Sequence, residues 1–423
     1  MRADAETVSG GSGAETSFWS NVRADVSWKG LALAAPLAAR DMSYALATLL
    51  AALLAFFVVR WGFRADAIGF DFEGTLWEPG VAIREGRSPY PAPVASEVDV
   101  GNPALYPPLL MVLIAPLTVL PWSVGVTVWT VLVGTALAAS LFILDVRDVR
   151  CYVLALISAP ATSGLVWGNA TLLLVPLVAL AWRWREHWLR TGVLVGLAIG
   201  SKLFLWPLLL WLLGTRRYRA FGAAVVVACV AVLAPWAVIG FVGLSSYPDL
   251  LRVAEEVYAV HGYSFATMLS ALGADTPLAS RSALALGLAI AAIAFVAGRR
   301  SRDEISLSLA VLAAILGSPI VWEYYYVLLF VPLAIARPRF SGLWVVLTLF
   351  YLTHRLPRPR LLASDLEVGG IACCRPDDIP QASWVFNHAP PGLWPAAGHA
   401  ALAAVLTTVV AWSTLRATSR RLQ

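Results

Sequence analysis

Residues 42–61 read MSYALATLLAALLAFFVVRW. An apolar helix of roughly 20 residues is long enough to cross the hydrocarbon core of a bilayer. Comparable apolar runs recur along the whole chain, and they are continuous rather than alternating, which favours helices over a β-barrel. The sequence therefore predicts an all-α polytopic membrane protein.

The composition supports a membrane protein and excludes several other classes. Of the 423 residues, 59% are hydrophobic and only 13% are charged, against about 25% charged residues in a typical soluble domain. The net charge of +5 does not indicate a nucleic-acid partner, because the basic residues form short clusters between apolar runs, as topology signals do. The partner implied by the composition is the lipid bilayer. The adjacent Cys373 and Cys374 are expected to be free thiols, since a disulfide between neighbours is strained.

Basic residues also set the expected orientation. The residues before the first span include Arg2, Arg23, Lys29 and Arg40, so the N-terminus is expected in the cytoplasm and the following loop outside. The first apolar run starts too late and is too long for a cleavable signal peptide. We expect roughly twelve membrane passes with both termini inside. The expected organisation is a partly disordered N-terminal tail (1–41), a transmembrane domain (42–415) with large outer loops (about 63–105, 243–278 and 357–395), and a C-terminal tail (416–423).

Two apolar segments are not predicted to cross the membrane as single unbroken helices. Residues 106–121 are apolar but short and bounded by prolines. A full span there would place the basic clusters at 145–150 and 183–187 outside, whereas a re-entrant segment places both inside, as the positive-inside bias requires. By the same logic, residues 191–214 are predicted to break into two half-helices at Gly200-Ser201-Lys202. A lysine at membrane depth is costly unless it faces water, a partner or a cavity, so Lys202 is a functional candidate, with simple snorkelling as the alternative.

The longest polar interruption in the first half of the chain runs from Gly69 to Pro108. It gathers four carboxylates, at Asp71, Glu73, Glu78 and Glu85. Polar groups held at a membrane face by long apolar helices usually have a function. The sequence shows no phosphate-binding loop, dinucleotide fingerprint, CxxC pair or clustered His/Asp metal spacing in a suitable context. We therefore expect chemistry at the outer membrane face without a nucleotide-binding domain.

Several short motifs follow one another in a recognisable order. They are Asp71-Phe72, Gly86-Arg87-Ser88-Pro89-Tyr90, Tyr106-Pro107-Pro108, Gly168-Asn169, Gly196…Lys202…Pro207 and Ser318-Pro319…Trp322. From about residue 45 to residue 340 the chain resembles glycosyltransferase family 87, whose members are polytopic enzymes of the C superfamily. The resemblance implies a GT-C-type bundle and an inverting glycosyltransferase in the bacterial plasma membrane. It implies transfer of a hexosyl group, mannosyl above all, from a polyprenyl-phosphate sugar to a cell-envelope glycolipid or polysaccharide at the outer face. No cofactor is implied; the sequence neither requires a divalent metal nor excludes one.

The resemblance also implies roles for individual residues. In the family an aspartate of the first outer loop is the general base, and Asp71 occupies that position. A carboxylate within hydrogen-bond reach of a sugar hydroxyl can take its proton as the new bond forms. Glu73 is the rival: the two side chains diverge on a helix but share a face on a strand. Lys202, Arg84 and Arg87 are the cations expected near the leaving phosphate.

The remaining candidates are groups expected to bind substrate. Glu323 stands where many relatives have a histidine, and three roles are open for it: acceptor contact, assistance to the base, or pairing with an arginine. His261 fits an ordinary loop histidine better than a ligand. The family often has a Gly-Gln-x-Asn turn where this chain has Gly168-Asn169, so the glutamine is missing. The substrate-binding candidates, besides the cations and Glu73, are Tyr90, Tyr106, Asn169, Glu323, Tyr324 and His261.

Two other functions are compatible with the same residues. A transporter or flippase for lipid-linked sugars would show internal repeats with paired broken helices. This chain has one candidate broken pair and no evident repeat, and its charged groups gather at one face, which favours an enzyme. A catalytically degenerate relative that binds a lipid-linked sugar without turnover is the third hypothesis, because of Glu323 and the missing glutamine.

Overall fold

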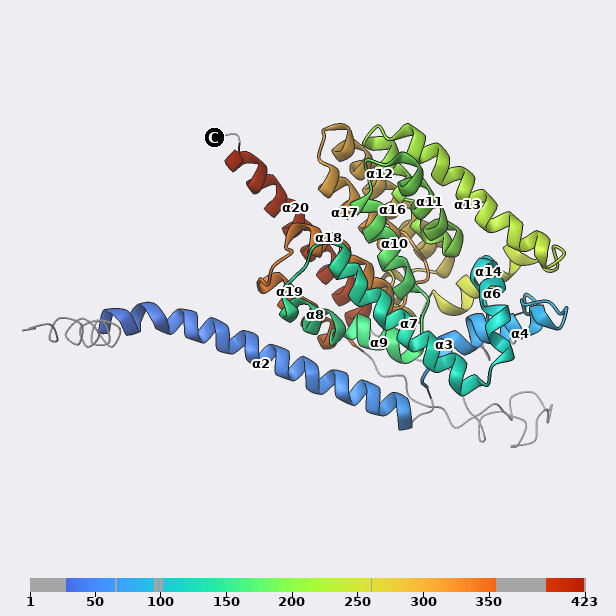
Figure 1. Cartoon of the computed structure of the whole chain (residues 1–423), viewed down its shortest axis with the longest axis horizontal. Helices are drawn as coiled ribbons and strands as arrows, with labels where there is room; N and C mark the ends of the chain where they lie inside the picture. Colours follow the sequence, from blue (N-terminus) through green and yellow to red (C-terminus); the bar gives the residue numbers. More distant parts are fainter. Residues whose placement is uncertain are drawn as a thin grey trace, which may run out of the picture. The chain divides into compact units, whose positions relative to one another are not determined.

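The computed structural model describes residues 28–64, 67–94, 98, 102–259, 261–354 and 393–421 (Figure 1). These residues form helices, turns and irregular segments, and none of them is in a strand. Two compact units are present, residues 1–50 and residues 51–423. The first unit contains the beginning of helix α2, and everything below concerns the second.

The helices follow one another along the described residues, with η marking 3₁₀ and π segments. They are α2 (Trp28–Arg64), α3 (Phe70–Phe72), η1 (Glu73–Trp77), α4 (Glu78–Arg84), α6 (Leu109–Ile114), η2 (Ala115–Val119), α7 (Trp122–Ile143), α8 (Val149–Leu156), α9 (Ala159–Trp167), α10 (Thr171–Arg183), α11 (Trp188–Ser201), η3 (Leu203–Leu205), α12 (Leu208–Gly214), α13 (Tyr218–Val238), α14 (Tyr247–Tyr258), α15 (Phe265–Ala271), α16 (Thr276–Arg299), α17 (Asp303–Leu316), η4 (Glu323–Leu329), α18 (Phe330–Ala336), α19 (Gly342–Val346), η5 (Leu347–Leu352) and α20 (Leu393–Arg421).

Five of the described helices are long and apolar enough to cross a membrane, and a sixth span arises if the bent pair α8 and α9 is counted as one. The five are Asp41–Phe63, Trp122–Ile143, Tyr218–Val238, Thr276–Arg299 and Leu393–Trp412. The all-helical membrane fold expected from the sequence is confirmed. The roughly twelve passes are not confirmed, because the other apolar helices are each shorter than a full span.

The predicted break at Lys202 is confirmed. Helix α11 ends at Ser201, Lys202 is extended (φ −146°, ψ 109°), and the short η3 and α12 follow. The segment expected to be re-entrant forms the short apolar helix Leu109–Val119. At 1.5 Å per residue such a helix reaches only about 16 Å, roughly half of the hydrocarbon core.

The expected loops and tails are only partly described. The second outer loop contains the helices α14 and α15. The expected N-terminal tail is helical from Trp28 and the expected C-terminal tail is helical to Arg421. The third outer loop, with Cys373 and Cys374, lies almost entirely outside the described residues.

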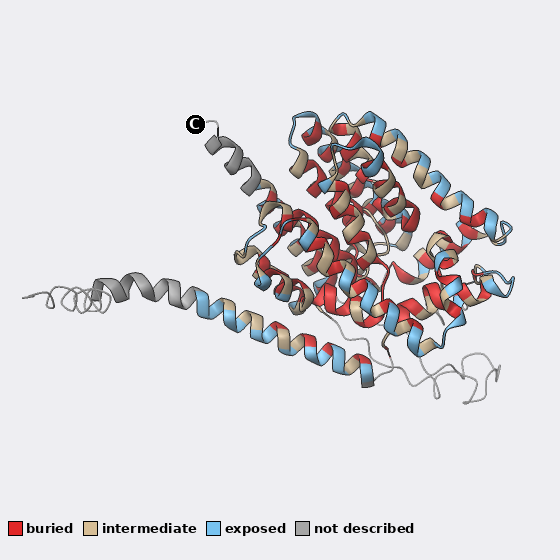
Figure 2. Ribbon diagram, viewed as in Figure 1, coloured by how far each residue is buried: buried red, intermediate tan, exposed pale blue. Residues whose placement is uncertain are grey.

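Small residues allow the helices to pack closely, as membrane helices do. A Cβ atom at Gly196 of α11 would lie 2.6 Å from Cβ of Val227 on α13, and one at Gly200 would lie 2.5 Å from Cβ of Ala231. These pairs show that α11 and α13 run parallel. The outward side of α13 exposes Val226, Val230 and Leu233, whereas the bundle interior is buried (Figure 2). In a bilayer the exposed side chains face lipid.

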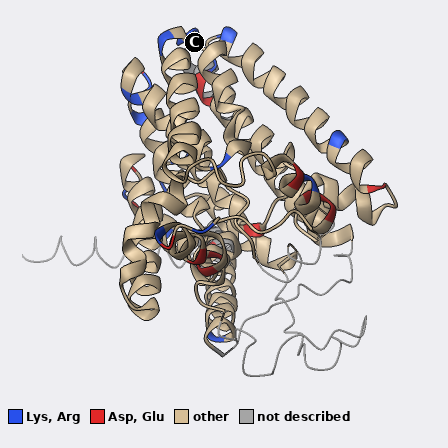
Figure 3. Cartoon of the chain, turned by 90° about the vertical axis from the view of Figure 1, so that its right-hand side faces the viewer, with Lys and Arg blue, Asp and Glu red and all other residues tan. Residues whose placement is uncertain are grey.

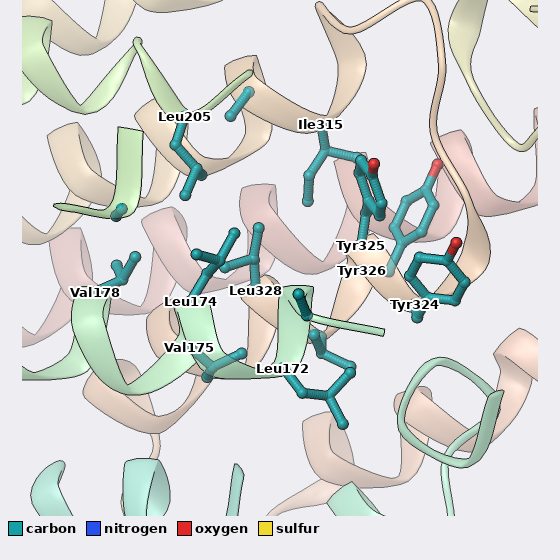
Figure 4. Close-up of a cluster of buried hydrophobic side chains, with 14 of the residues drawn as sticks. Leu172, Leu174, Val175, Val178, Leu205, Ile315, Tyr324, Tyr325, Tyr326 and Leu328 are labelled. Carbon is teal, nitrogen blue, oxygen red and sulfur yellow. The ribbon is translucent and has the colours of Figure 1, made fainter. Parts of the chain in front are cut away.

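Charged side chains are sparse, and Lys and Arg lie mostly at the ends of the helices (Figure 3). Lys202 is an exception, since it is 2% exposed within the bundle. The buried core next to it packs Leu172, Leu174, Val175 and Val178 of α10 against Leu328 of η4 (Figure 4). Tyr324, Tyr325 and Tyr326 come from the same turn of η4, so the core fixes the segment that carries these hydroxyls.

Candidate active site

Asp71 lies on the short helix α3 and is 6% exposed. The residue before the helix is Gly69, whose φ of +81° is left-handed, a conformation that favours glycine. A Cβ atom at Gly69 would lie 2.4 Å from Cγ2 of Val126, so space as well as conformation requires glycine. The next residue, Phe72, stacks on Trp129 with ring centroids 4.6 Å apart. The aromatic stack anchors α3 and thereby fixes the Asp71 side chain.

The Asp71 carboxylate is held by several hydrogen-bond donors. Asn169 donates from Nδ2 to Oδ2 of Asp71 at 2.7 Å, Asn102 donates from its own Nδ2 to Oδ1, and Tyr324 also hydrogen-bonds to the carboxylate. Burial raises the pKa of Asp71 above its ordinary value, because desolvation disfavours the charged form. The hydrogen bonds and the positive charge of Lys202 oppose this shift without cancelling it. A carboxyl group with a raised pKa is a stronger base than an exposed one.

Lys202 is connected to Asp71 through Asn169. Its Nζ donates to Oδ1 of Asn169 at 3.1 Å and to Oγ1 of Thr171 at 2.8 Å. The same ammonium lies 4.2 Å from the ring centroid of Tyr106 and 4.6 Å from that of Tyr325. Neutral dipoles and aromatic faces therefore hold this buried charge, and no carboxylate is bonded to it directly among the described residues.

The turn that places Asn169 follows helix α9. Gly168 ends that helix with φ +67°, and a Cβ atom there would lie 3.1 Å from Cβ of Phe72. Trp129 donates from Nε1 to the carbonyl oxygen of Gly168 at 2.6 Å. Trp129 thus contacts both Phe72 beside Asp71 and the turn before Asn169, which brings these two distant segments together.

A cavity of about 370 Å³ opens beside these groups. Its polar lining includes side chains that contact Asp71 or Lys202, namely Thr75, Asn102, Tyr106, Tyr324 and Tyr325, together with Lys202 itself. Tyr247, Glu255, Tyr258 and Ser318 also line the cavity. Its apolar lining includes Leu203, Phe204, Trp206, Leu284 and Ile320. Leu203 and Leu284 are 43% and 47% exposed, so the apolar part reaches the surface that faces lipid in a bilayer. The cavity can therefore hold a molecule with a charged head and a hydrocarbon tail.

The sequence model of glycosyltransferase family 87 matches residues 104–321. The chain belongs to glycosyltransferase family 87. The matched range contains Tyr106, Asn169 and Lys202, and it ends just before Glu323, so it includes much of the cavity lining but begins after Asp71. As a family 87 member the chain is a membrane glycosyltransferase.

Two relatives extend the comparison. The polyprenol-phosphate-mannose-dependent alpha-(1-2)-phosphatidylinositol pentamannoside mannosyltransferase of Mycolicibacterium smegmatis is 28% identical over 313 residues, which cover 70% of this chain and 71% of the relative. The enzyme of the same name from Mycobacterium tuberculosis is 26% identical over 348 residues, 78% of this chain and 73% of the relative. No solved structure matches this family 87 chain.

Of the candidates proposed from the sequence, the structure brings together Asp71, Tyr106, Asn169, Lys202 and Tyr324. Several others lie elsewhere. Arg84 donates to the carbonyl oxygen of Thr118 at 2.8 Å, and the exposed Arg87 pairs with Glu85. Neither arginine lines the cavity, nor do Glu73 and His261. Asp71 and Asn169 do not line it either, but they contact the lining residues Asn102, Tyr324 and Lys202.

Tyr90 does not line the cavity but contacts Tyr106, which does. It stacks on Trp236 with centroids 5.0 Å apart, and its hydroxyl donates to the carbonyl oxygen of Tyr106 at 2.8 Å. Tyr90 is buried at 7% exposure, so its ring is already engaged and does not offer a free face to a sugar.

Glu323 belongs to a separate buried cluster. Its carboxylate oxygens lie 2.6 Å from Nδ1 of His354 and 3.2 Å from Nε2 of His399. Glu323 is 3% exposed and does not line the cavity, whereas the adjacent Tyr324 does. The cluster is therefore joined through the backbone to Tyr324, the next residue, which contacts Asp71.

Asn102, Thr75, Thr171 and Tyr325 were not among the sequence candidates, although the structure places them in the site. Thr171 follows Asn169 by two residues and Tyr325 follows Tyr324, so their nearness to candidates was the available signal. Asn102 carried no such signal. Among the described residues, no group of three or more His, Cys, Asp or Glu side chains is placed to hold a metal ion.

Proposed function

We propose that this chain transfers a hexosyl group, mannosyl in the first instance, from a polyprenyl-phosphate sugar to a hydroxyl of a cell-envelope glycolipid or polysaccharide. The reaction takes place at the outer face of the plasma membrane and inverts the anomeric centre. The observation that carries the proposal is the Asp71–Asn169–Lys202 chain of hydrogen bonds beside an amphipathic cavity. The names of the two mycobacterial relatives supply the donor class.

Asp71 acts as the general base. The acceptor hydroxyl attacks the anomeric carbon while its proton passes to the Asp71 carboxylate, and the bond between that carbon and the phosphate oxygen breaks. The electron pair of the broken bond leaves with the polyprenyl phosphate. Because three donors already hold Asp71, the acceptor displaces one of them or uses a remaining lone pair. The carboxylate keeps its orientation in either case.

Lys202 neutralises the phosphate as it leaves. Its ammonium lines the cavity, and it is hydrogen-bonded to neutral acceptors and lies over aromatic rings. A preorganised cation in a water-poor site stabilises developing negative charge strongly. The apolar lining near Leu203 and Trp206 then holds the first isoprene units of the donor.

The test is transfer from radiolabelled polyprenyl-phosphate mannose into membrane lipids by wild type and by Asp71→Asn. The substitution keeps the side-chain shape and removes the base, so we expect transfer to fall by about 10²–10⁴-fold. Glu73→Gln is the matched control, because it removes a neighbouring carboxylate on η1 by the same kind of substitution, and it should keep most activity.

Equal transfer by wild type and Asp71→Asn would contradict the assignment of Asp71. Loss in Glu73→Gln alone would move the base to Glu73. No transfer by any variant would argue against the donor or against catalysis, and uptake of a labelled lipid-linked sugar into vesicles then tests transport.

A further inference from the structure

A second cavity lies at the other end of helix α11, away from Asp71. It has a volume of about 340 Å³ and is formed where the end of α10, the start of α11 and the turn between α12 and α13 meet. Lys202 follows the last residue of α11, and the cavity lies at the first, Trp188. The 14 residues of α11 separate the two sites by about 20 Å at 1.5 Å per residue. The second cavity therefore plays no direct part in sugar transfer.

Arginine dominates this cavity. Its lining includes Arg185, Arg216, Arg217 and Arg219, and Glu186 is its one acidic side chain. Lys and Arg positions, blue on the ribbon, gather at this end of the bundle (Figure 3).

A partly buried ion pair fixes the turn that carries these arginines. Arg217 donates from Nη1 and Nη2 to the two carboxylate oxygens of Asp303 at 3.0 and 2.9 Å, and Trp211 donates to Asp303 at 2.6 Å. Arg216 has a left-handed φ of +62°, so the chain reverses just before the anchored residue. The guanidinium of Arg217 is thus committed to Asp303, and the neighbouring arginines are held on a rigid turn.

The charges at this cavity do not balance. Arg185 lies 3.4 Å from Asp303 and Arg217 lies 2.8 Å from Glu186, so the two carboxylates are shared by these two arginines. Arg216 and Arg219 are exposed and form no ion pair within the part of the chain that the structure describes. Two positive charges are therefore left for an anion. The first turn of α13 adds N–H groups, since no side chain caps that helix among the described residues.

The surroundings favour a lipid over a soluble anion. Trp188 and Tyr218, both at the cavity, are 49% and 55% exposed, and Leu189 is 53% exposed. Aromatic side chains next to exposed apolar ones are typical of the headgroup level of a membrane. Basic pockets between membrane helices at this level bind anionic headgroups.

We propose that this cavity binds the phosphate of an anionic phospholipid headgroup, with Arg216 and Arg219 as its principal ligands. The lipid lies in the leaflet nearest the start of α11 and α13. Its glycerol backbone lies beside Trp188 and Tyr218, and its acyl chains follow the exposed apolar side of α13. The site is separate from donor binding, because it is at the far end of α11 from Lys202.

The experiment measures lipid-dependent thermal stabilisation of purified full-length protein in detergent, with added phosphatidylglycerol or phosphatidylcholine. The test variant is Arg216→Gln/Arg219→Gln. The control is Arg252→Gln/Arg281→Gln, which makes the same charge change at exposed positions. Arg299, at the end of α16, donates to Tyr218 of the cavity lining at 2.9 Å. Arg281 is near the start of the same helix, so it lies about 27 Å from the cavity at 1.5 Å per residue.

We expect phosphatidylglycerol, but not phosphatidylcholine, to raise the melting temperature of wild type and of the control. The Arg216→Gln/Arg219→Gln variant should need roughly tenfold more lipid for the same shift, which corresponds to about 1.4 kcal/mol. Equal responses of test and control variants would overturn the proposal, as would the absence of any phosphatidylglycerol response. A parallel titration with inorganic phosphate separates the two sources of the anion: stabilisation by phosphate alone, as strong as by the lipid, would also overturn it.

Discussion

Nδ2 of Asn169 lies 2.7 Å from Oδ2 of Asp71, although the two residues are 98 positions apart in the chain. The other end of the same amide accepts a hydrogen bond from Lys202 at 3.1 Å. The carboxylate can only accept and the ammonium can only donate, so the orientation of the amide is determined. Asn169 therefore links the proposed base to the proposed phosphate-binding cation.

Replacing Asn169 by alanine should impair both groups. It leaves a buried carboxylate and a buried ammonium each without one partner, at a cost of about 1–3 kcal/mol each. If both costs are expressed in the transition state, they add up to about 2–6 kcal/mol, and kcat falls by roughly 30- to 10⁴-fold. Asn102→Ala is the comparison, because it removes a donor from Asp71 without touching Lys202. Steady-state transfer assays should show a smaller loss for Asn102→Ala, and an equal loss would contradict the linking role.

The sequence predicted much of this site because short motifs carry its residues. Asp71, Asn169 and Lys202 were chosen from motifs that resemble those of the family, and the structure places them together. The break at Lys202 was predictable because a charged residue within an apolar run flanked by basic clusters is incompatible with a simple span.

Other parts of the site were not predictable from local pattern. Arg84 and Arg87 were expected near the phosphate, yet Arg84 is bound to Thr118 and Arg87 to Glu85. Asn102 contacts Asp71 although the two residues are 31 positions apart, and nothing in the spacing indicates that approach. Contacts of this kind depend on how helices pack, which the apolar runs do not specify.

Lys202→Met should reduce transfer with little loss of fold. Methionine fills a similar volume and removes a buried charge whose hydrogen bonds go to neutral groups, so the protein should still melt cooperatively. Loss of the cation beside the leaving phosphate should lower kcat by about 10²–10³-fold. A melting curve recorded beside the transfer assay separates the two effects. Full activity in a folded Lys202→Met protein would show that another group stabilises the phosphate.

The pH dependence of transfer should report Asp71. The base acts only when deprotonated, and burial raises the pKa of Asp71 above 3.8. As the pH falls, kcat/KM should therefore decline on an acid limb whose midpoint lies above 3.8, since protonation removes the acceptor for the hydroxyl proton. The measurement is a pH profile of kcat/KM in detergent, from the ordinary aspartate pKa of 3.8 up to pH 8. An acid limb centred at or below 3.8 would place the base in a more exposed carboxylate.

The Glu323–His354 pair should make stability depend on pH. Burial lowers the pKa of His354, but the charge and hydrogen bond of Glu323 outweigh it, so the net pKa is raised above 6.5. A histidine with a raised folded-state pKa contributes stability that is complete below pH 6.5 and is lost as the pH rises through the raised pKa. The melting temperature of wild type should therefore fall over that range. Glu323→Gln should melt lower at pH 6 and lose most of this slope, whereas the exposed Glu256→Gln should behave as wild type.

Because Tyr324 follows Glu323 and contacts Asp71, the Glu323→Gln protein should also transfer sugar more slowly than Glu256→Gln. An unchanged slope in Glu323→Gln would show that another group titrates.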